Sequence, residues 1–279
     1  MGEYFQFLEK QEITHLILDK YALSEYDYEL SDEDKKRYGE IATRLSELSS
    51  SFSHNVLDAT HAFSITIADK AELTGLPESA LAAAKELATS KDNNGYTFTL
   101  DIPSYLPVMM YCDNASLREK LYTAFVTRAS DQGPNANEFD NSNIMNELLS
   151  LRHELAGLLD FDNYAQHSLT TKMANSTSEV MEFLENLALK SQHQGKQDFQ
   201  ELTDFAASEF SQHNLQAWDL AYYSEKLKQS RYAISDEELR PYFPKDKVVS
   251  GLFEVVHKLF GLSIKLREGR KNLYLVNEK

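Results

Sequence analysis

Residues 141–159 read NSNIMNELLSLRHELAGLL, and the fold predicted for this chain rests on this stretch. Most of its large apolar residues recur three or four positions apart, which places them on one side of an α-helix. At about 100° per residue they fall within roughly a 100° sector, the width of the buried stripe of an amphipathic helix. The stripe consists of Ile144, Leu148, Leu151, Leu155, Leu158 and Leu159.

The same stretch contains His153 followed by Glu154, which is how a zinc-peptidase motif begins. In His-Glu-x-x-His, two histidines one turn apart bind the metal and the Glu activates water. The position of the second histidine holds Gly157, which has no donor atom. The helical wheel places His153 about opposite the apolar stripe, beside Leu149, Ala156 and Gly157. For His153 and Glu154 we therefore predict packing or hydrogen bonding between helices, and no zinc site.

Composition favours helix along the whole chain, since 279 residues include only 10 Gly and 6 Pro. Ser31 precedes an acidic first turn, Ser235 and Glu238 are spaced as a capping box, and Gly261 is a typical helix terminator. Besides the opening stretch, helices are expected at about residues 31–58, 76–88, 113–130, 175–192, 195–210, 217–233, 235–243 and 247–261.

Two short segments break the helical pattern. In residues 63–67 (FSITI) and 95–103 (GYTFTLDIP), apolar and polar residues alternate and many are β-branched or aromatic. The second segment ends at Pro103. They predict a small strand pair beside the helices. No Pro/Gly/Ser-rich linker divides the chain. We therefore predict a mainly α fold, with residues 1–279 as one helical domain and two lobes as an open alternative.

Charge and cysteine content exclude several classes of protein. The chain has 28 Lys and Arg against 44 Asp and Glu, a formal net charge of −16. Nucleic acid needs a basic surface, and an anionic membrane is disfavoured for the same reason. Cys112 is the only cysteine, so no intramolecular disulfide can form. Neither a secretory signal nor an apolar run of about 18 residues is present. We expect a cytoplasmic protein.

Other combinations of reactive residues are weaker candidates. His54, Asp58 and His61 would share a face if one helix reached all three, but His61 leads into the predicted strand. We interpret them as a solvated polar face. Cys112 has no basic partner nearby in sequence, so we predict a buried thiol. The aromatic cluster of Trp218, Tyr222 and Tyr223 is interpreted as core or interface.

Four long segments then carry a family resemblance: residues 37–60 (RYGEIATRLSELSSSFSHNVLDAT), 100–134, 151–174 (LRHELAGLLDFDNYAQHSLTTKMA) and 217–244. In this order they closely resemble the thimet-oligopeptidase family of zinc metallopeptidases. The resemblance runs from about residue 38 to 261, and residues 262–279 form a divergent tail. Asp160 stands where the family pattern LLGF has Gly, which suggests an altered helix end.

The resemblance implies an oligopeptidase-like (neurolysin-like) helical fold and hydrolysis of short peptides in a channel between two lobes. It also implies one zinc held by His-Glu-x-x-His and a downstream Glu. That motif occurs nowhere in these 279 residues. We therefore expect a truncated, inactive part of such an enzyme, with no catalytic, cofactor-binding or metal residue of its own. The alternatives are one half of a split peptidase completed by a second chain, and a non-catalytic peptide-binding module.

Two further expectations follow from the resemblance. The expected partners are short peptides, or the missing catalytic lobe or second chain. Arg240 and Tyr242 belong to the matched segment RPYFP and are candidates to approach the channel.

Overall fold

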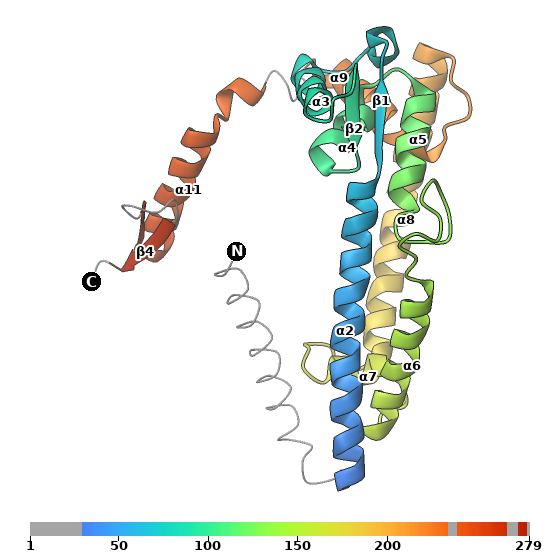
Figure 1. Cartoon of the computed structure of the whole chain (residues 1–279), viewed down its shortest axis with the longest axis vertical. Helices are drawn as coiled ribbons and strands as arrows, with labels where there is room; N and C mark the ends of the chain where they lie inside the picture. The colour runs from blue at the N-terminus through green and yellow to red at the C-terminus, as the bar shows by residue number, and fades with distance from the viewer. Residues whose placement is uncertain (1–29, 234–238, 267–272, 278–279) are drawn as a thin grey trace. The chain divides into compact units, whose positions relative to one another are not determined.

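The computed structural model describes residues 30–233, 239–266 and 273–277, and most of them are helical (Figure 1). The chain divides into two compact units, one ending at Asp219 and one beginning at Leu220. The prediction of a mainly α chain with a minor strand pair is confirmed. The longer elements of the first unit are α2 (Asp32–Ala62), β1 (Ser64–Ile67), α3 (Glu78–Ser90), β2 (Tyr96–Thr99), α4 (Ile102–Tyr111), α5 (Ala115–Val126), α6 (Ser142–Leu158), α7 (Tyr164–Leu169) and α8 (Thr177–Phe210).

Helix α2 begins where the sequence predicts, because Ser31 is its N-cap. The Ser31 hydroxyl accepts a hydrogen bond from the backbone N–H of Asp34 at 3.1 Å, which satisfies one of the free donors of the first turn. Three acidic residues in that turn also stabilise the helix, because their negative charge interacts favourably with the positive end of the helix dipole. The helix continues to Ala62, past the predicted end at residue 58. His61 therefore lies within the helix, contrary to the prediction that the strand excludes it.

The small sheet follows α2 directly. Strands β1 and β2 pair antiparallel, with Ile65 opposite Phe98. Strand β2 ends at Thr99, earlier than the predicted Pro103, because Pro103 belongs to the first turn of α4. Proline is well tolerated there since its missing N–H would have no partner in any case. The helix also contains Pro107 in its interior.

The main core of the first unit lies between this sheet and helices α3, α4 and α5. Phe98 of β2, Val108 of α4 and Leu121 of α5 are almost completely buried. Figure 1 shows these elements gathered where α2 passes into β1. The buried members of this core are Leu73, Leu76, Leu81, Ala84, Phe98, Tyr105, Val108, Met109, Cys112, Leu117 and Leu121.

Helix α8 is longer than either segment predicted for it. The sequence indicates helix at 175–192 and again from about Gly195, whereas the structure has one helix that passes through Gly195. A glycine inside a helix costs about 1 kcal/mol relative to alanine, so it weakens a long helix without ending it. Its N-cap is Ser176, whose hydroxyl accepts from the N–H of Glu179 at 3.1 Å.

The second unit contains α9 (Leu220–Tyr232), a short 3₁₀ turn η3 (Arg240–Tyr242), α11 (Lys245–Phe260) and the antiparallel strands β3 (Leu262–Leu266) and β4 (Leu273–Asn277). Gly261 ends α11 with φ at +66°, as predicted. The predicted capping box at Ser235 lies outside the described residues. The β3–β4 pair was not predicted, although apolar and more polar residues alternate in both 262–266 (LSIKL) and 273–277 (LYLVN).

Candidate functional site

The opening stretch forms α6, which packs antiparallel against α2. Figure 1 shows the two helices side by side. Tyr38 and Ile41 of α2 are buried together with Leu155 of α6 and Leu159 at its end. Side chains that pack around them include Leu45 and Leu151, so the predicted apolar stripe is the face that meets α2.

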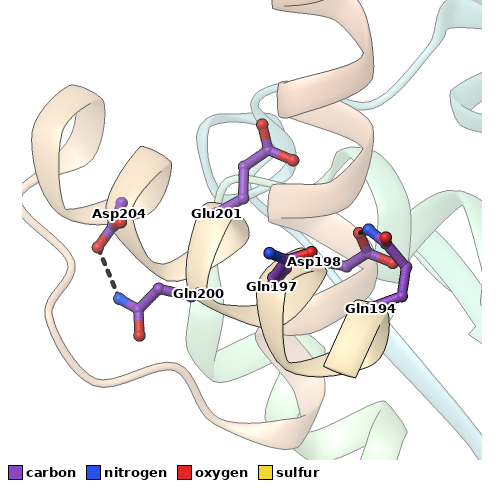
Figure 2. Close-up of a pocket in the computed structure, with 6 residues that line it drawn as sticks. All are labelled: Gln194, Gln197, Asp198, Gln200, Glu201 and Asp204. Atoms are coloured by element: carbon purple, nitrogen blue, oxygen red, sulfur yellow. Dashed lines mark hydrogen bonds between the residues drawn. The ribbon is translucent and has the colours of Figure 1, made fainter. Parts of the chain in front are cut away.

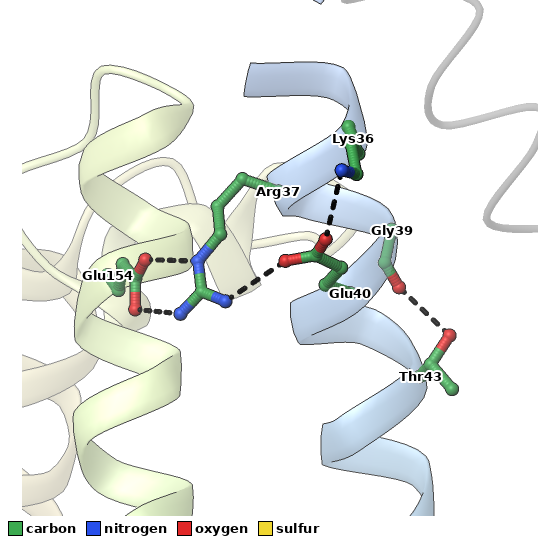
Figure 3. Close-up of polar contacts among 6 residues, drawn as sticks. All are labelled: Lys36, Arg37, Gly39, Glu40, Thr43 and Glu154. Carbon is green, nitrogen blue, oxygen red and sulfur yellow. Dashed lines mark hydrogen bonds and ion pairs between the residues drawn. The ribbon is translucent and has the colours of Figure 1, made fainter. Parts of the chain in front are cut away.

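Glu154 of the His-Glu pair binds Arg37 of α2 rather than a metal (Figure 3). The two carboxylate oxygens of Glu154 accept from Nε and Nη2 of Arg37 at 2.6 and 2.8 Å. The remaining terminal nitrogen of Arg37 lies 3.3 Å from Glu40. Such a two-pronged contact fixes geometry better than a single ion pair. Glu154 therefore has the hydrogen-bonding role between helices that the sequence predicts.

The same contact recurs seven residues along each helix. Arg44 of α2 donates to both oxygens of Glu147 of α6, at 2.6 and 3.0 Å. Because Arg37 meets Glu154 and Arg44 meets Glu147, the two pairs fix the antiparallel register. Hydrogen bonding to Arg44 and Arg37 lowers the pKa of Glu147 and Glu154, respectively. Both carboxylates are partly exposed, so they contribute specificity of pairing more than stability.

Asn141, just before α6, adds a buried polar contact. Its side-chain oxygen accepts from Asn55 of α2 at 2.8 Å, and its side-chain nitrogen donates to the carbonyl of Phe52 at 3.2 Å. Asn141 is 2 % exposed, so these bonds replace its hydration. The sequence indicates Asn141 or Ser142 as the start of the helix, and Asn141 is the N-cap without a capping side-chain bond.

His153 is exposed, so its position opposite the apolar stripe is confirmed, whereas the packing between helices predicted for it is not. Leu149 and Gly157, placed on the same side, are exposed too. Ala156, placed on that side as well, is fully buried, so the buried face of α6 is broader than the predicted stripe.

The end of α6 shows how Asp160 replaces glycine. Asp160 has φ at +63°, and the N–H of Phe161 bonds to the carbonyl of Ala156 at 2.9 Å. Together with the bond from the Asp160 N–H to the Gly157 carbonyl, this is the Schellman end that glycine normally supplies. The helix therefore keeps the usual end geometry, and the alteration expected from the sequence is limited to backbone strain at Asp160, because a residue with a Cβ adopts positive φ less easily than glycine.

The residues of the described chain do not fit a zinc ion. Tetrahedral zinc needs three or four His, Cys, Asp or Glu donors that converge. In residues 30–233, 239–266 and 273–277, no three such side chains come together in that way. His54, Asp58 and His61 all lie exposed on α2. A zinc ion of the family kind therefore has no site among the described residues.

Cys112 is buried, as predicted, at the end of α4. Burial raises the pKa of its thiol, and the sulfur lies 3.7 Å from the carbonyl of Glu72. A thiol that is 0 % exposed and kept neutral is a poor nucleophile.

A buried ion pair lies close to this thiol, and sequence reasoning missed it. Arg118 of α5 donates to Asp219 and to the carbonyl of Cys112, each at 2.6 Å. The second oxygen of Asp219 accepts from the N–H of Gln216 at 3.1 Å. The side chains of Arg118 and Asp219 are 2 % and 4 % exposed. These contacts tie the turn η2 (Ala217–Asp219) to α5 and to the end of α4.

The aromatic cluster is part of the packing, as interpreted from the sequence. Trp218 packs against the main core, with its ring 6.1 Å from that of Tyr122. Tyr222 and Tyr223 are buried. Tyr242 is exposed in η3, and the side chain of its neighbour Arg240 lies outside the described residues.

A shallow polar hollow lies along α8 (Figure 2). All six lining residues come from this one helix and are exposed, and two of its hydrogen bonds join residues one turn apart. The hollow therefore lacks the converging buried groups of a catalytic site. Its lining consists of Gln194, Gln197, Asp198, Gln200, Glu201 and Asp204.

Comparison with known proteins identifies the lineage. The model of peptidase family M3 matches residues 108–278. This chain belongs to peptidase family M3. The match includes the buried pair, α6, α8 and the residues after Gly261, where the resemblance noted from the sequence stops.

Similar proteins of this family are oligopeptidases. Oligopeptidase A of Salmonella typhimurium is 58 % identical over 246 residues, which are 86 % of this chain and 36 % of the relative. Oligopeptidase A of Escherichia coli is 58 % identical over 87 % of the chain and 36 % of the relative. The organellar oligopeptidase A of Arabidopsis thaliana is 41 % identical over 86 % of the chain. The chain thus spans about a third of the length of these relatives. In the part of this M3 chain that the structure describes, no helix combines the length and apolarity that crossing a membrane requires.

Proposed function

We propose that this chain is a helical, non-catalytic portion of an oligopeptidase A-like M3 peptidase and hydrolyses no peptide by itself. The observation that carries the proposal is that Glu154 of the His-Glu pair is bound to Arg37 and that position 157 is glycine. The 279 residues contain no His-Glu-x-x-His in which a zinc ion and its water could be held.

The portion's proposed role is to supply a rigid helical wall beside the catalytic part. The paired Arg–Glu contacts set the register of α2 and α6, and the buried pair of Arg118 and Asp219 holds the end of the first unit to its core. Short peptides and a zinc-bearing part of the peptidase are the proposed partners. Whether that part is joined to this portion or is a second chain does not alter the role.

The compartment we propose is the cytoplasm. The single cysteine is a free, buried thiol, which suits a reducing environment.

The test is a zinc and peptidase assay on the purified chain. After incubation with equimolar zinc and gel filtration, metal analysis should find far less than one zinc per chain. A quenched fluorescent peptide of about ten residues should be cleaved no faster than in buffer. One tightly bound zinc per chain, together with cleavage that a chelator abolishes, would contradict the proposal.

A further inference from the structure

Residues 93–95 read NNG and lie in the connection between α3 and β2. Asn94 and Gly95 form the only Asn–Gly pair in the 279-residue sequence. Asn94 is exposed, and its side chain makes no hydrogen bond to any residue that the structure describes. Its amide group is therefore accessible to water and to the backbone nitrogen of the next residue.

An asparagine before glycine can lose its amide group without an enzyme, and asparagine counts among the thermolabile residues. The backbone nitrogen of Gly95 attacks Cγ of Asn94, and a C–N bond forms as the bond from Cγ to Nδ2 breaks. The amide group leaves as ammonia with the proton of the Gly95 N–H, and a five-membered succinimide ring remains. Water then opens the ring at either carbonyl, which gives aspartate or isoaspartate. Glycine favours the attack because it has no Cβ to hinder the approach.

The two Asn–Ser pairs of the chain, which also place a small residue after asparagine, are held by hydrogen bonds. Asn141 is 2 % exposed, and both its side-chain oxygen and its side-chain nitrogen are bonded. Nδ2 of Asn175 donates to the carboxylate of Glu179 at 3.2 Å. At Asn94, by contrast, an exposed side chain without such a bond coincides with a following glycine.

The residues on both sides of Asn94 are anchored to β1. The side chain of Asn93 donates to Oγ1 of Thr66 at 3.3 Å. Gly95 has φ at +120°, and a Cβ at this position would overlap the carbonyl oxygen of Ile67. Little room is therefore left for a longer main chain between the two anchors.

Isoaspartate at position 94 would lengthen the main chain at this point. Its backbone runs through Cβ, which adds one carbon atom just before β2. Ile67 pairs with Tyr96 at the first position of that strand, and Phe98, two residues further on, is 1 % exposed in the main core. A displaced strand would therefore lose register with β1 and disturb the packing of Phe98. Aspartate adds the same charge and keeps the ordinary backbone.

We propose that Asn94 deamidates spontaneously in the folded chain and that the isoaspartate formed there weakens the pairing of β1 with β2. Water is the only other reactant. The modification involves neither zinc nor a peptide, so it does not depend on the proposed function.

The test incubates the full chain at physiological temperature and follows each asparagine by peptide mapping and mass spectrometry, since deamidation adds one mass unit. Asn94 should react at least tenfold faster than Asn214, which is also exposed and without a side-chain hydrogen bond to any described residue but precedes leucine. The rate should rise with pH, because the attacking Gly95 nitrogen must lose its proton. The variant N94Q should abolish the reaction at this position, since glutamine would have to close a six-membered ring.

Equal rates at Asn94 and Asn214 would overturn the proposed site. So would a rate at Asn94 that is more than tenfold slower in the native chain than in the chain unfolded by guanidinium chloride, because the fold would then protect the residue.

The effect on the sheet is measured on the aged chain. Anion exchange separates the deamidated molecules by their added negative charge, and methyl transfer from S-adenosylmethionine by an isoaspartyl methyltransferase counts the isoaspartate in them. The control is N94D, which has the charge with the ordinary backbone and should unfold at the same urea concentration as the unsubstituted chain. The isoaspartyl fraction should unfold at a lower concentration, and a midpoint equal to that of N94D would overturn the proposed weakening of the sheet.

Discussion

Replacing Asp219 with alanine should destabilise the first unit strongly. Asp219 accepts hydrogen bonds from the Arg118 guanidinium and from the Gln216 N–H, and the substitution removes both. The guanidinium is only 2 % exposed, and it keeps its hydrogen bond to the carbonyl of Cys112. Removing one partner of a buried pair costs about 3–5 kcal/mol, because a buried charge loses its compensation. We therefore expect a loss of about 4 kcal/mol in the free energy of unfolding.

Urea unfolding followed by far-UV circular dichroism measures this loss. With a slope of about 2 kcal/mol per molar urea, the midpoint should fall by roughly 2 M. The control is the double variant R118M/D219L, which removes both charges and keeps apolar volume. It should recover at least half of the loss, since apolar replacements of buried pairs are often neutral, while the Cys112 carbonyl loses a donor and the Gln216 N–H loses an acceptor. A midpoint for D219A within about 0.3 M of the unsubstituted chain would refute the reasoning.

Three further outcomes are expected. D160G should raise the free energy of unfolding by about 1 kcal/mol in the same urea assay, because glycine adopts the positive φ of Asp160 without strain; a decrease would count against the Schellman end. Cys112 should react with a thiol reagent only at the rate of unfolding, and fast labelling of the native chain would show that it is not buried. The pKa values of Glu147 and Glu154 are lowered in the folded state, so their stabilisation is present above their ordinary pKa of about 4.3 and is lost as the pH falls through the lower folded values. Between pH 5 and 3 the melting temperature should therefore fall more steeply for the unsubstituted chain than for E147Q/E154Q, and equal slopes would contradict the pairing.

Local patterns predicted the elements whose causes are local. The Ser31 cap and the Gly261 stop are confirmed because each acts on backbone groups within a few residues. The apolar stripe of α6 is confirmed since its period depends only on helix geometry. The strand end predicted at Pro103 is wrong, because Pro103 lies in the first turn of α4, where proline is tolerated.

Contacts between distant segments were not predictable in the same way. Arg37 and Arg44 are seven residues apart, as are Glu147 and Glu154, and this equal spacing is a signal that could have paired α2 with α6. No such pattern links Arg118 with Asp219, since their contact depends on how the chain folds back over about a hundred residues. The missing second histidine was readable directly from the sequence at Gly157, and the structure adds that Glu154 is bound to Arg37.

The most direct test of the central claim is zinc content and peptide cleavage measured on one preparation of the purified chain. The account predicts negligible zinc after gel filtration and no cleavage above the buffer rate. Stoichiometric zinc and chelator-sensitive cleavage by the chain alone would contradict it.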